Sequence, residues 1–298
     1  MIIKDGVTER GYAKINLHLD ITGRLDGGFH SVATVMQTVS LYDEITICGL
    51  EESDAPGFSV KCNVDGVPTD EKNLAVRAAL LFCERAGLSL CGVIDIKKNI
   101  PMAAGMAGGS ADGAATLRAL NRAVGEPLST VELCEIGSRL GSDVPFCVVG
   151  GTAYADGKGD KLHPFPEMPD CVILAACEGE GVSTPWAYRL LDEIYGGFTD
   201  ESLYSPVSVG GLKAALESRE ITAVAENMYN IFEEPVLERR PVAAEIKRIM
   251  TAGGAISAMM SGSGPSVFGI FKCENCAKEV SALLSDRGYR GYICKPIK

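Results

Sequence analysis

A run of small residues at positions 101–110 is the part of the sequence best suited to hold a phosphate group. It reads Pro-Met-Ala-Ala-Gly-Met-Ala-Gly-Gly-Ser and lies between a predicted strand and a predicted helix. Without bulky side chains, such a loop lets backbone N–H groups close around phosphate oxygens, and the helix N-terminus adds favourable partial charge. Ser110 is placed to cap the helix and to reach a magnesium ion or a phosphate. The alternative is an ordinary strand-to-helix turn that needs glycine for its dihedral angles.

Two other glycine-bearing segments bear on this interpretation. Residues 151–159 miss the Walker A pattern Gly-x-x-x-x-Gly-Lys-Ser/Thr, because Gly151 and Gly157 are one residue too far apart and Gly159 follows the lysine. Residues 260–266, Met-Ser-Gly-Ser-Gly-Pro-Ser, lie between two predicted strands in the second half of the chain. Two glycine loops on separate predicted domains indicate a ligand in a cleft between them. The alternative for 260–266 is a hairpin turn.

Residues 13–21 alternate strictly between apolar and polar types, which predicts a strand. Its polar side chains are Lys14, Asn16, His18 and Asp20. We expect this to be a strand with a polar working face, and we interpret His18 and His163 as structural.

Taken together, these segments resemble the GHMP kinase superfamily and, within it, the kinases that phosphorylate 4-diphosphocytidyl-2-C-methyl-D-erythritol. Four blocks follow the family's order: Ala-Lys-Ile-Asn-Leu at 13–17 continuing to Gly28-Phe29-His30, the loop at 101–110, Leu-Gly-Ser-Asp-Val-Pro at 140–145, and the loop at 260–266. The glycine and serine loops are typical of the superfamily. The Lys14–Asn16 strand joined to the Phe29-His30 turn indicates the kinases with a cytidyl substrate.

The resemblance implies that Lys14 and Asp143 are catalytic and flank the substrate hydroxyl, with Asp143 as base or proton acceptor. Phosphoryl transfer needs mainly positioning and charge stabilisation, so two such groups and Mg-ATP would suffice. The alternatives are a solvated strand lysine at Lys14 and a helix N-cap at Asp143.

The resemblance also implies a substrate that carries a cytidine diphosphate group. Phe29 would stack on the cytosine ring, His30 would hydrogen-bond its edge, and Asn16 would lie nearer the methylerythritol hydroxyl. The family often has tyrosine where this chain has Phe29, and the ring needed for stacking is retained. Tyr188 would supply the second stacking face, with simple helix packing as the alternative for Tyr188 and Trp186.

The cofactors implied are ATP and Mg²⁺, with Ser110 as the residue that reaches the metal. The expected ATP-binding residues are Pro101, Met102, Ala103, Ala104, Gly105, Met106, Ala107, Gly108, Gly109, Ser110 and Ala111, with adenine near Asn73, Leu74 and Lys98. The loop departs from the family at Ala103, Ala104 and Ala107, where glycine is common, and at Ala111, where a second serine often stands. An alanine costs nothing where φ is negative and is strained where it is positive.

The elements that must position these residues are predicted from periodicity and turn signals. In the first half we expect strands at 13–21, 45–50, 58–64 and 93–98 and helices at 73–86, 110–124 and 129–140, the last with a capping box of Ser129 and Glu132 and a closing Gly141. In the second half we expect strands at 171–177, 256–260, 267–271 and 291–294 and helices at 185–194, 209–217, 242–251 and 275–287.

This order of elements predicts an α+β protein of two domains, 1–165 and 166–298, with the junction near residue 165. The resemblance implies the GHMP kinase fold, with a ribosomal-protein-like N-terminal domain and a ferredoxin-like α/β sandwich as C-terminal domain. The first domain would carry the ATP phosphate loop.

Composition narrows the possible partners and the cellular location. A net charge of −11 over 298 residues, without a basic run, argues against general nucleic-acid binding. No secretory signal and no apolar stretch of membrane-spanning length stands out, so we expect a cytoplasmic monomer or homodimer that acts on a small molecule.

The 11 cysteines do not form the dense framework of a small secreted domain, so we expect most to be reduced and buried. Cys273 and Cys276 make the one CxxC motif. A tetrahedral zinc site would need a second pair, and only Cys294 lies nearby in the sequence. A metal or redox role and a pair of half-buried thiols near a helix start are the two interpretations.

Two other functions stay open at this stage. One is a superfamily kinase that acts on a sugar, homoserine or a mevalonate-like alcohol. The other is a catalytically silent ligand-binding relative, because a fold does not fix a function.

Overall fold

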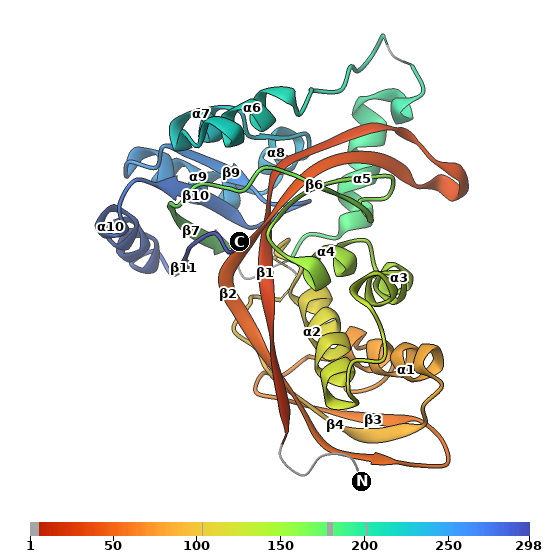
Figure 1. Ribbon diagram of the computed structural model, residues 1–298. Helices are drawn as coiled ribbons and strands as arrows, with labels where there is room; N and C mark the ends of the chain where they lie inside the picture. Colours follow the sequence, from red (N-terminus) through yellow and green to blue (C-terminus); the bar gives the residue numbers. More distant parts are fainter. Residues whose placement is uncertain (1–5, 103, 178–180, 201) are drawn as a thin grey trace. The chain divides into compact units, whose positions relative to one another are not determined.

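The computed structural model describes residues 6–102, 104–177, 181–200 and 202–298 (Figure 1). The chain divides into two compact units, and each is made of separate stretches of sequence. Unit 1 comprises 1–13, 42–102 and 107–150, and unit 2 comprises 14–41, 103–106 and 151–298. Two long strands, β1 (Val7–Arg24) and β2 (His30–Glu52), contribute residues to both units. The predicted junction near residue 165 stays a prediction.

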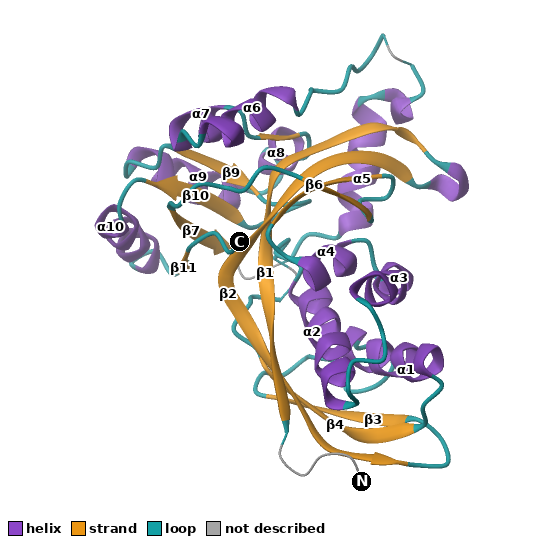
Figure 2. Cartoon of the chain, in the orientation of Figure 1, coloured by secondary structure: helices purple, strands orange, loops and turns teal. Residues whose placement is uncertain are grey.

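In unit 1, helices pack against a sheet that is built around β4 (Leu90–Lys97). β4 pairs antiparallel with the second half of β2 and parallel with β3 (Gly57–Cys62). The helices are α1 (Leu74–Ala86), α2 (Gly108–Ala123), α3 (Thr130–Leu140) and α4 (Asp143–Val149) (Figure 2). Their apolar residues form one core with the sheet, in which Phe82, Ile94 and Leu117 are fully buried.

Local signals in the sequence explain where two of these helices begin. The side chain of Asn73 accepts a hydrogen bond from the N–H of Ala75 and so caps α1. The predicted capping box of α3 is confirmed, because Ser129 and Glu132 satisfy each other's backbone N–H groups. Gly141 ends α3 as predicted.

Unit 2 contains a four-stranded antiparallel sheet in the order β11-β7-β10-β9. The strands are β7 (Val172–Cys177), β9 (Ser257–Met260), β10 (Val267–Phe271) and β11 (Arg290–Cys294). Numbered along the chain, they lie in the order 4-1-3-2, which is the order of a ferredoxin-like sheet. α9 (Pro241–Ala252) and α10 (Glu274–Ser285) share a core with this sheet.

The rest of unit 2 surrounds the parts of β1 and β2 that belong to it. β2 pairs with β5 (Thr152–Asp156), which pairs with β6 (Lys161–Pro164), and β1 pairs with the short β8 (Tyr229–Asn230). The remaining helices are α5 (Thr184–Ile194), α6 (Gly210–Ser218), α7 (Ile221–Glu226) and α8 (Glu233–Leu237). Two short 3₁₀ turns lie at Asp26–Gly28 and Gly196–Phe198.

The strand predicted at 13–21 forms as part of β1, but its polar face is buried. Lys14, Asn16 and His18 are 4%, 3% and 1% exposed, and Asp20 is fully buried. Burial lowers the pKa of His18 to about 4, so its imidazole is neutral at pH 7. The other polar groups must therefore be satisfied inside the protein.

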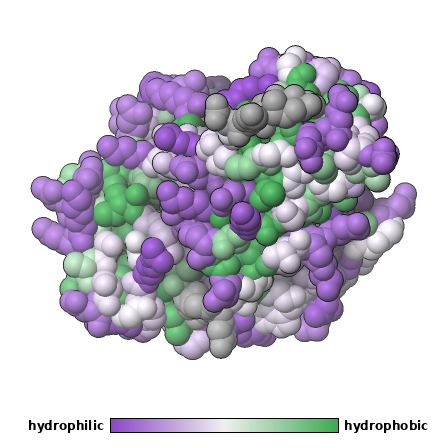
Figure 3. Space-filling view, turned by 90° about the horizontal axis from the view of Figure 1, so that it is seen from below, coloured by the Kyte–Doolittle hydropathy of each residue, from purple (hydrophilic) through white to green (hydrophobic). Residues whose placement is uncertain are grey.

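The surface carries most of the charge. The face drawn in Figure 3 is largely hydrophilic, with hydrophobic residues in scattered patches between. Across the described residues, none of the helices has the length and apolar character needed to span a membrane.

Candidate active site

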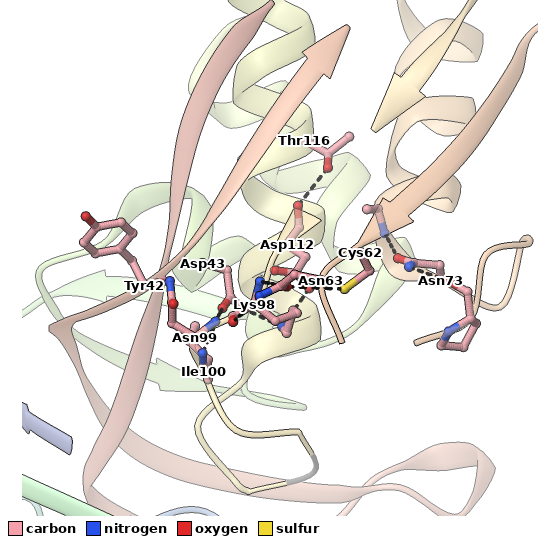
Figure 4. A network of polar contacts seen from close by, with 12 residues as sticks. Tyr42, Asp43, Cys62, Asn63, Asn73, Lys98, Asn99, Ile100, Asp112 and Thr116 are labelled. Carbon is pink, nitrogen blue, oxygen red and sulfur yellow. Dashed lines mark hydrogen bonds and ion pairs between the residues drawn. The ribbon is translucent and has the colours of Figure 1, made fainter. Parts of the chain in front are cut away.

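A buried charge cluster of three residues lies beside the predicted phosphate loop in unit 1 (Figure 4). The Lys98 ammonium donates to Asp43 Oδ2 at 2.6 Å and to Asp112 Oδ2 at 2.9 Å. All three side chains are buried, and Asp43 is completely inaccessible. The three residues come from β2, the end of β4, and α2, so the cluster ties these elements together.

Asp43 also fixes the backbone that leads into the loop. Its Oδ1 accepts the N–H groups of Asn99 at 2.6 Å and Ile100 at 2.8 Å. The amide of Asn63 accepts the N–H of Lys98 at 2.7 Å and donates to its carbonyl. The three residues before Pro101 are therefore held by side chains far away in the sequence.

The far end of the loop is fixed by close packing against Lys98. A Cβ on Gly108, the first residue of α2, would lie 3.2 Å from the Lys98 ammonium nitrogen and 3.1 Å from Ile100. A side chain at this position would therefore require Ile100 or the ammonium to shift by a few tenths of an ångström. The cluster thus holds both the entry to the loop and the start of α2.

The structure corrects the predicted start of the helix after the loop. We expected Ser110 to cap a helix beginning there, but α2 begins at Gly108 and Ser110 lies within its first turn. The N-cap is Ala107, which has φ 58° and ψ 30° and makes no side-chain cap. A left-handed conformation costs alanine about 1–2 kcal/mol, so the alanine at this position is strained. Ala103 lies outside the described residues.

The two polar residues expected near adenine, Asn73 and Lys98, have side chains that are already engaged. Asn73 caps α1 and donates to the carbonyl of Pro68 at 2.7 Å, while the Lys98 ammonium is held by two carboxylates. Asp143, the expected proton acceptor, is half-buried and is the first helical residue of α4, where a negative charge is favourable. The roles of Asn73, Lys98 and Asp143 toward ATP and the substrate stay predictions.

In unit 2, the expected catalytic lysine and the expected substrate-binding asparagine are neighbours. Lys14 Nζ donates to Asn16 Oδ1 at 2.6 Å, and Asn16 Nδ2 donates to Thr34 Oγ1 at 2.9 Å. Thr34 in turn donates to the carbonyl of His18. This chain of contacts links β1 to β2 and fixes which way the Asn16 amide faces.

The second glycine loop contacts residues 104–106 of the phosphate loop, which belong to the same unit. Ser261 Oγ donates to Gly105 O at 3.2 Å, and the N–H of Ser266 donates to Ala104 O at 3.2 Å. Gly105 has φ 75°, and a Cβ there would lie 2.6 Å from Ser261 O. The N–H of Lys14 donates to Met106 O at 3.2 Å. The carbonyl groups of 104–106 are thus all held.

Asn230 holds the backbone of the second glycine loop through two hydrogen bonds. Its Nδ2 donates to Met260 O at 2.7 Å and to Gly262 O at 2.9 Å. Sequence reasoning missed Asn230, because it lies 30 residues from Met260 in an unremarkable segment. Only its position directly before the apolar pair Ile231-Phe232 hints at burial.

Two of the three expected base-recognition residues, His30 and Tyr188, are in contact in unit 2. His30 Nε2 lies 2.7 Å from Asp192 Oδ1, and Arg24 forms a salt bridge of 2.7 Å with the same oxygen. The Tyr188 ring packs on the His30 ring with centroids 4.8 Å apart, and Phe198 meets His30 edge-on. Tyr188 also packs against Phe232, so the alternative of helix packing describes part of its role.

Phe29 differs from its neighbour in being open to solvent. Its side chain is 53% exposed, and the Lys158 ammonium lies 3.7 Å from the ring centroid. An exposed aromatic ring beside a cation can accept a planar ligand and an anionic group together. Sequence reasoning did not find Lys158 or Asp192, which come from the β5–β6 turn and from α5.

Two family models match the chain, one in each half. The GHMP kinases N terminal domain matches residues 73–151, and the GHMP kinases C terminal domain matches residues 212–290. The chain is therefore a GHMP kinase by family, as predicted.

Relatives narrow the family further. The chain is 39% identical to a 4-diphosphocytidyl-2-C-methyl-D-erythritol kinase of Lachnospira eligens, with 95% of each chain covered. It is 42% identical to the kinase of the same name from Caldicellulosiruptor saccharolyticus, over 88% of this chain and 87% of that one. Within the GHMP kinases, the chain belongs to the 4-diphosphocytidyl-2-C-methyl-D-erythritol kinase family.

Solved structures confirm the predicted fold class. A crystal structure of 4-(cytidine 5'-diphospho)-2C-methyl-D-erythritol kinase matches with a TM-score of 0.79 and 29% identity, over 98% of this chain and 99% of that one. The homoserine kinase of Cytophaga hutchinsonii matches with a TM-score of 0.73 at 20% identity, over 98% and 95% of the two chains. The latter likeness concerns the fold alone.

The charge cluster generates a prediction about pH. One ammonium neutralises one carboxylate, and Asp43 is further stabilised as an anion by two N–H donors, so the excess proton belongs on Asp112. Burial, followed by repulsion from Asp43, raises the pKa of Asp112 to about 8. The contribution of the Asp112 proton to stability is fully present below the ordinary carboxyl pKa of 3.8 and is lost progressively as pH rises from there through about 8.

We predict that Asp112→Asn, which stays neutral, gains about 1 kcal/mol in unfolding free energy relative to wild type between pH 7 and pH 9. Urea unfolding at a series of pH values measures the difference. Asp95→Asn, an exposed carboxylate on β4, serves as control and should follow the wild-type profile. Parallel profiles for Asp112→Asn and wild type would contradict the assignment of the proton to Asp112.

Proposed function

We propose that this chain transfers the γ-phosphoryl group of ATP to the 2-hydroxyl of 4-diphosphocytidyl-2-C-methyl-D-erythritol, a step of non-mevalonate isoprenoid biosynthesis. The observation that carries the proposal is the presence, in one compact unit, of the Lys14–Asn16 hydrogen bond, the packed rings of His30 and Tyr188, and the exposed ring of Phe29. A protein that phosphorylates a cytidyl alcohol needs residues that act at the reacting hydroxyl and residues that bind the base.

In this proposal the phosphate loop and the start of α2 bind the ATP phosphates through backbone N–H groups. Mg²⁺ keeps several water ligands and binds substrate phosphates, and Ser110 would contribute its hydroxyl as one ligand. The charge cluster positions the loop and leaves its own carboxylates out of contact with the nucleotide.

The Lys14 ammonium would stabilise negative charge that develops at the substrate hydroxyl and the transferred phosphoryl group. Because Lys14 is buried, its charge acts in a medium of low dielectric, where it is worth more than in water. Asp143 would accept the hydroxyl proton. A loose transition state needs that proton removed only late, so a weak base is adequate.

Two alternatives remain as outcomes of experiment. A kinase for a sugar, homoserine or a mevalonate-like alcohol would have no use for a site that takes a nucleobase at Phe29. A silent ligand-binding relative would not need Lys14, Ser110 and Asp143 together. We further propose a cytoplasmic enzyme, monomer or homodimer, with a small-molecule substrate and no nucleic-acid or membrane partner.

We predict that Lys14→Ala and Asp143→Ala each lower kcat by about 100-fold or more, because each removes a group that acts at the reacting atoms. Phosphate transfer from Mg-ATP to the cytidyl substrate gives kcat, and circular dichroism checks the fold. Lys61→Ala, an exposed lysine on β3, should leave kcat unchanged. Near-normal turnover in both site variants would refute the assigned mechanism.

We also predict that Phe29→Ala raises the KM of the cytidyl substrate by about tenfold, because stacking on a base is worth 1–3 kcal/mol. The KM of ATP should stay unchanged. Phe29→Tyr, which keeps the ring, is the matched variant and should restore the wild-type KM. Equal KM values for Phe29→Ala and wild type would remove the base-stacking role from Phe29.

A further inference from the structure

The CxxC motif of the sequence forms a close pair of thiols at the start of α10. Cys273 is the N-cap of this helix and lies two residues after the end of β10. The sulfur atoms of Cys273 and Cys276 are 2.6 Å apart, and the N–H of Cys276 donates to Cys273 Sγ at 3.3 Å. Cys273 is exposed and Cys276 is partly exposed, so both sulfurs are within reach of a reagent in solution.

The two thiols have different chemical characters. Cys273 Sγ accepts a hydrogen bond from the backbone N–H of Cys276, at the positive end of a helix, and shares a thiol–thiol hydrogen bond with Cys276. These contacts lower the pKa of Cys273, the thiol hydrogen bond with Cys276 contributing most, and they raise that of Cys276. Cys273 is thus the nucleophile of the pair, and Cys276 is the thiol that resolves a mixed disulfide.

Cys294 and Cys171 differ from this pair. Cys294 is buried, and burial raises its pKa to about 12; the pKa of Cys171 is raised to the same value by the same cause. A tetrahedral zinc site takes four ligands, and in the described part of the chain no three His, Cys, Asp or Glu residues are grouped to hold a metal ion. The arrangement favours sulfur–sulfur chemistry over metal binding.

We propose that Cys273 and Cys276 are a thiol–disulfide exchange site that forms a reversible intramolecular disulfide with small disulfides of the glutathione class. The Cys273 thiolate attacks one sulfur of glutathione disulfide, which forms a mixed disulfide and releases one glutathione thiol. The Cys276 sulfur then loses its proton and attacks Cys273 Sγ, which closes the Cys273–Cys276 bond and releases the second glutathione. Two protein thiols are oxidised, one glutathione disulfide is reduced to two thiols, and the two protons end on glutathione.

Closure should require little movement of the fold. The two sulfurs are already adjacent, and Cys273 stays at the N-cap when its sulfur is bonded to Cys276. No residue of the proposed kinase site is part of α10 or of its N-cap. The oxidised protein should therefore keep its kinase activity, which separates the test of this exchange site from the test of the proposed function.

The test uses the full chain equilibrated in glutathione buffers of increasing oxidised fraction, followed by acid quenching, alkylation and tryptic mass spectrometry. Trypsin cuts after Lys272 and Lys278, so both cysteines fall on peptide 273–278. We expect this peptide to lose both alkyl labels and two hydrogen masses while the peptides carrying Cys48 and Cys62 remain labelled. Dithiothreitol should restore both labels.

Two variants assign the roles. Cys276→Ser should accumulate a mixed disulfide with one glutathione on Cys273, since the resolving thiol is gone. Cys273→Ser should form that adduct at Cys276 about tenfold more slowly, because the activated thiolate is gone. If peptide 273–278 keeps both labels until the other cysteines are also oxidised, or if the two variants react at equal rates, the proposed exchange site is refuted.

Discussion

The arrangement of the proposed nucleotide-binding residues depends on one interaction. This is the pairing of the buried Lys98 ammonium with Asp43 and Asp112. An unpaired ammonium at this depth would cost several kcal/mol, so the two carboxylates and the lysine constrain one another strongly. Because the three residues come from β2, the end of β4, and α2, their pairing determines where β4 ends and where α2 begins. The phosphate loop is the chain between those two points.

The same requirement, that buried polar groups be paired, also determines how the expected substrate-binding residues of unit 2 are arranged. Lys14, Asn16 and Thr34 satisfy one another along β1 and β2, and Ser261 and Asn230 satisfy the carbonyl groups of two glycine-rich turns. These residues leave the backbone of 104–106 with carbonyls that are all hydrogen-bonded. A loop held in this way can present its N–H groups to a phosphate without first having to become ordered.

Much of the fold could be predicted from local patterns, because those patterns act over a few residues. The alternation at 13–21 predicts its strand, and Ser129 with Glu132 predicts the start of α3. The pattern of period two does not say what covers the polar face of a strand, which is why the burial of Lys14 and Asn16 was not expected. The left-handed Ala107 has no signal in its residue type, so the cap was wrongly assigned to Ser110.

The site residues that sequence reasoning missed are those whose partners are distant in the chain. Asp43 meets Lys98 across 55 residues, and His30 meets Asp192 across 162. No turn signal or periodicity reports such a pairing, and only the folded chain brings the groups together. The family resemblance supplied the proposed roles of Lys14 and Asp143, which composition and spacing alone leave open.

The most direct test of the account is phosphate transfer from Mg-ATP to 4-diphosphocytidyl-2-C-methyl-D-erythritol, with galactose, homoserine and mevalonate tried in parallel. Mass spectrometry identifies the phosphorylated product, and ³¹P NMR locates the new ester. We predict one added phosphate on the 2-hydroxyl of the cytidyl substrate and none on the other alcohols. Transfer to one of the other alcohols instead, or to none of the four, would contradict it.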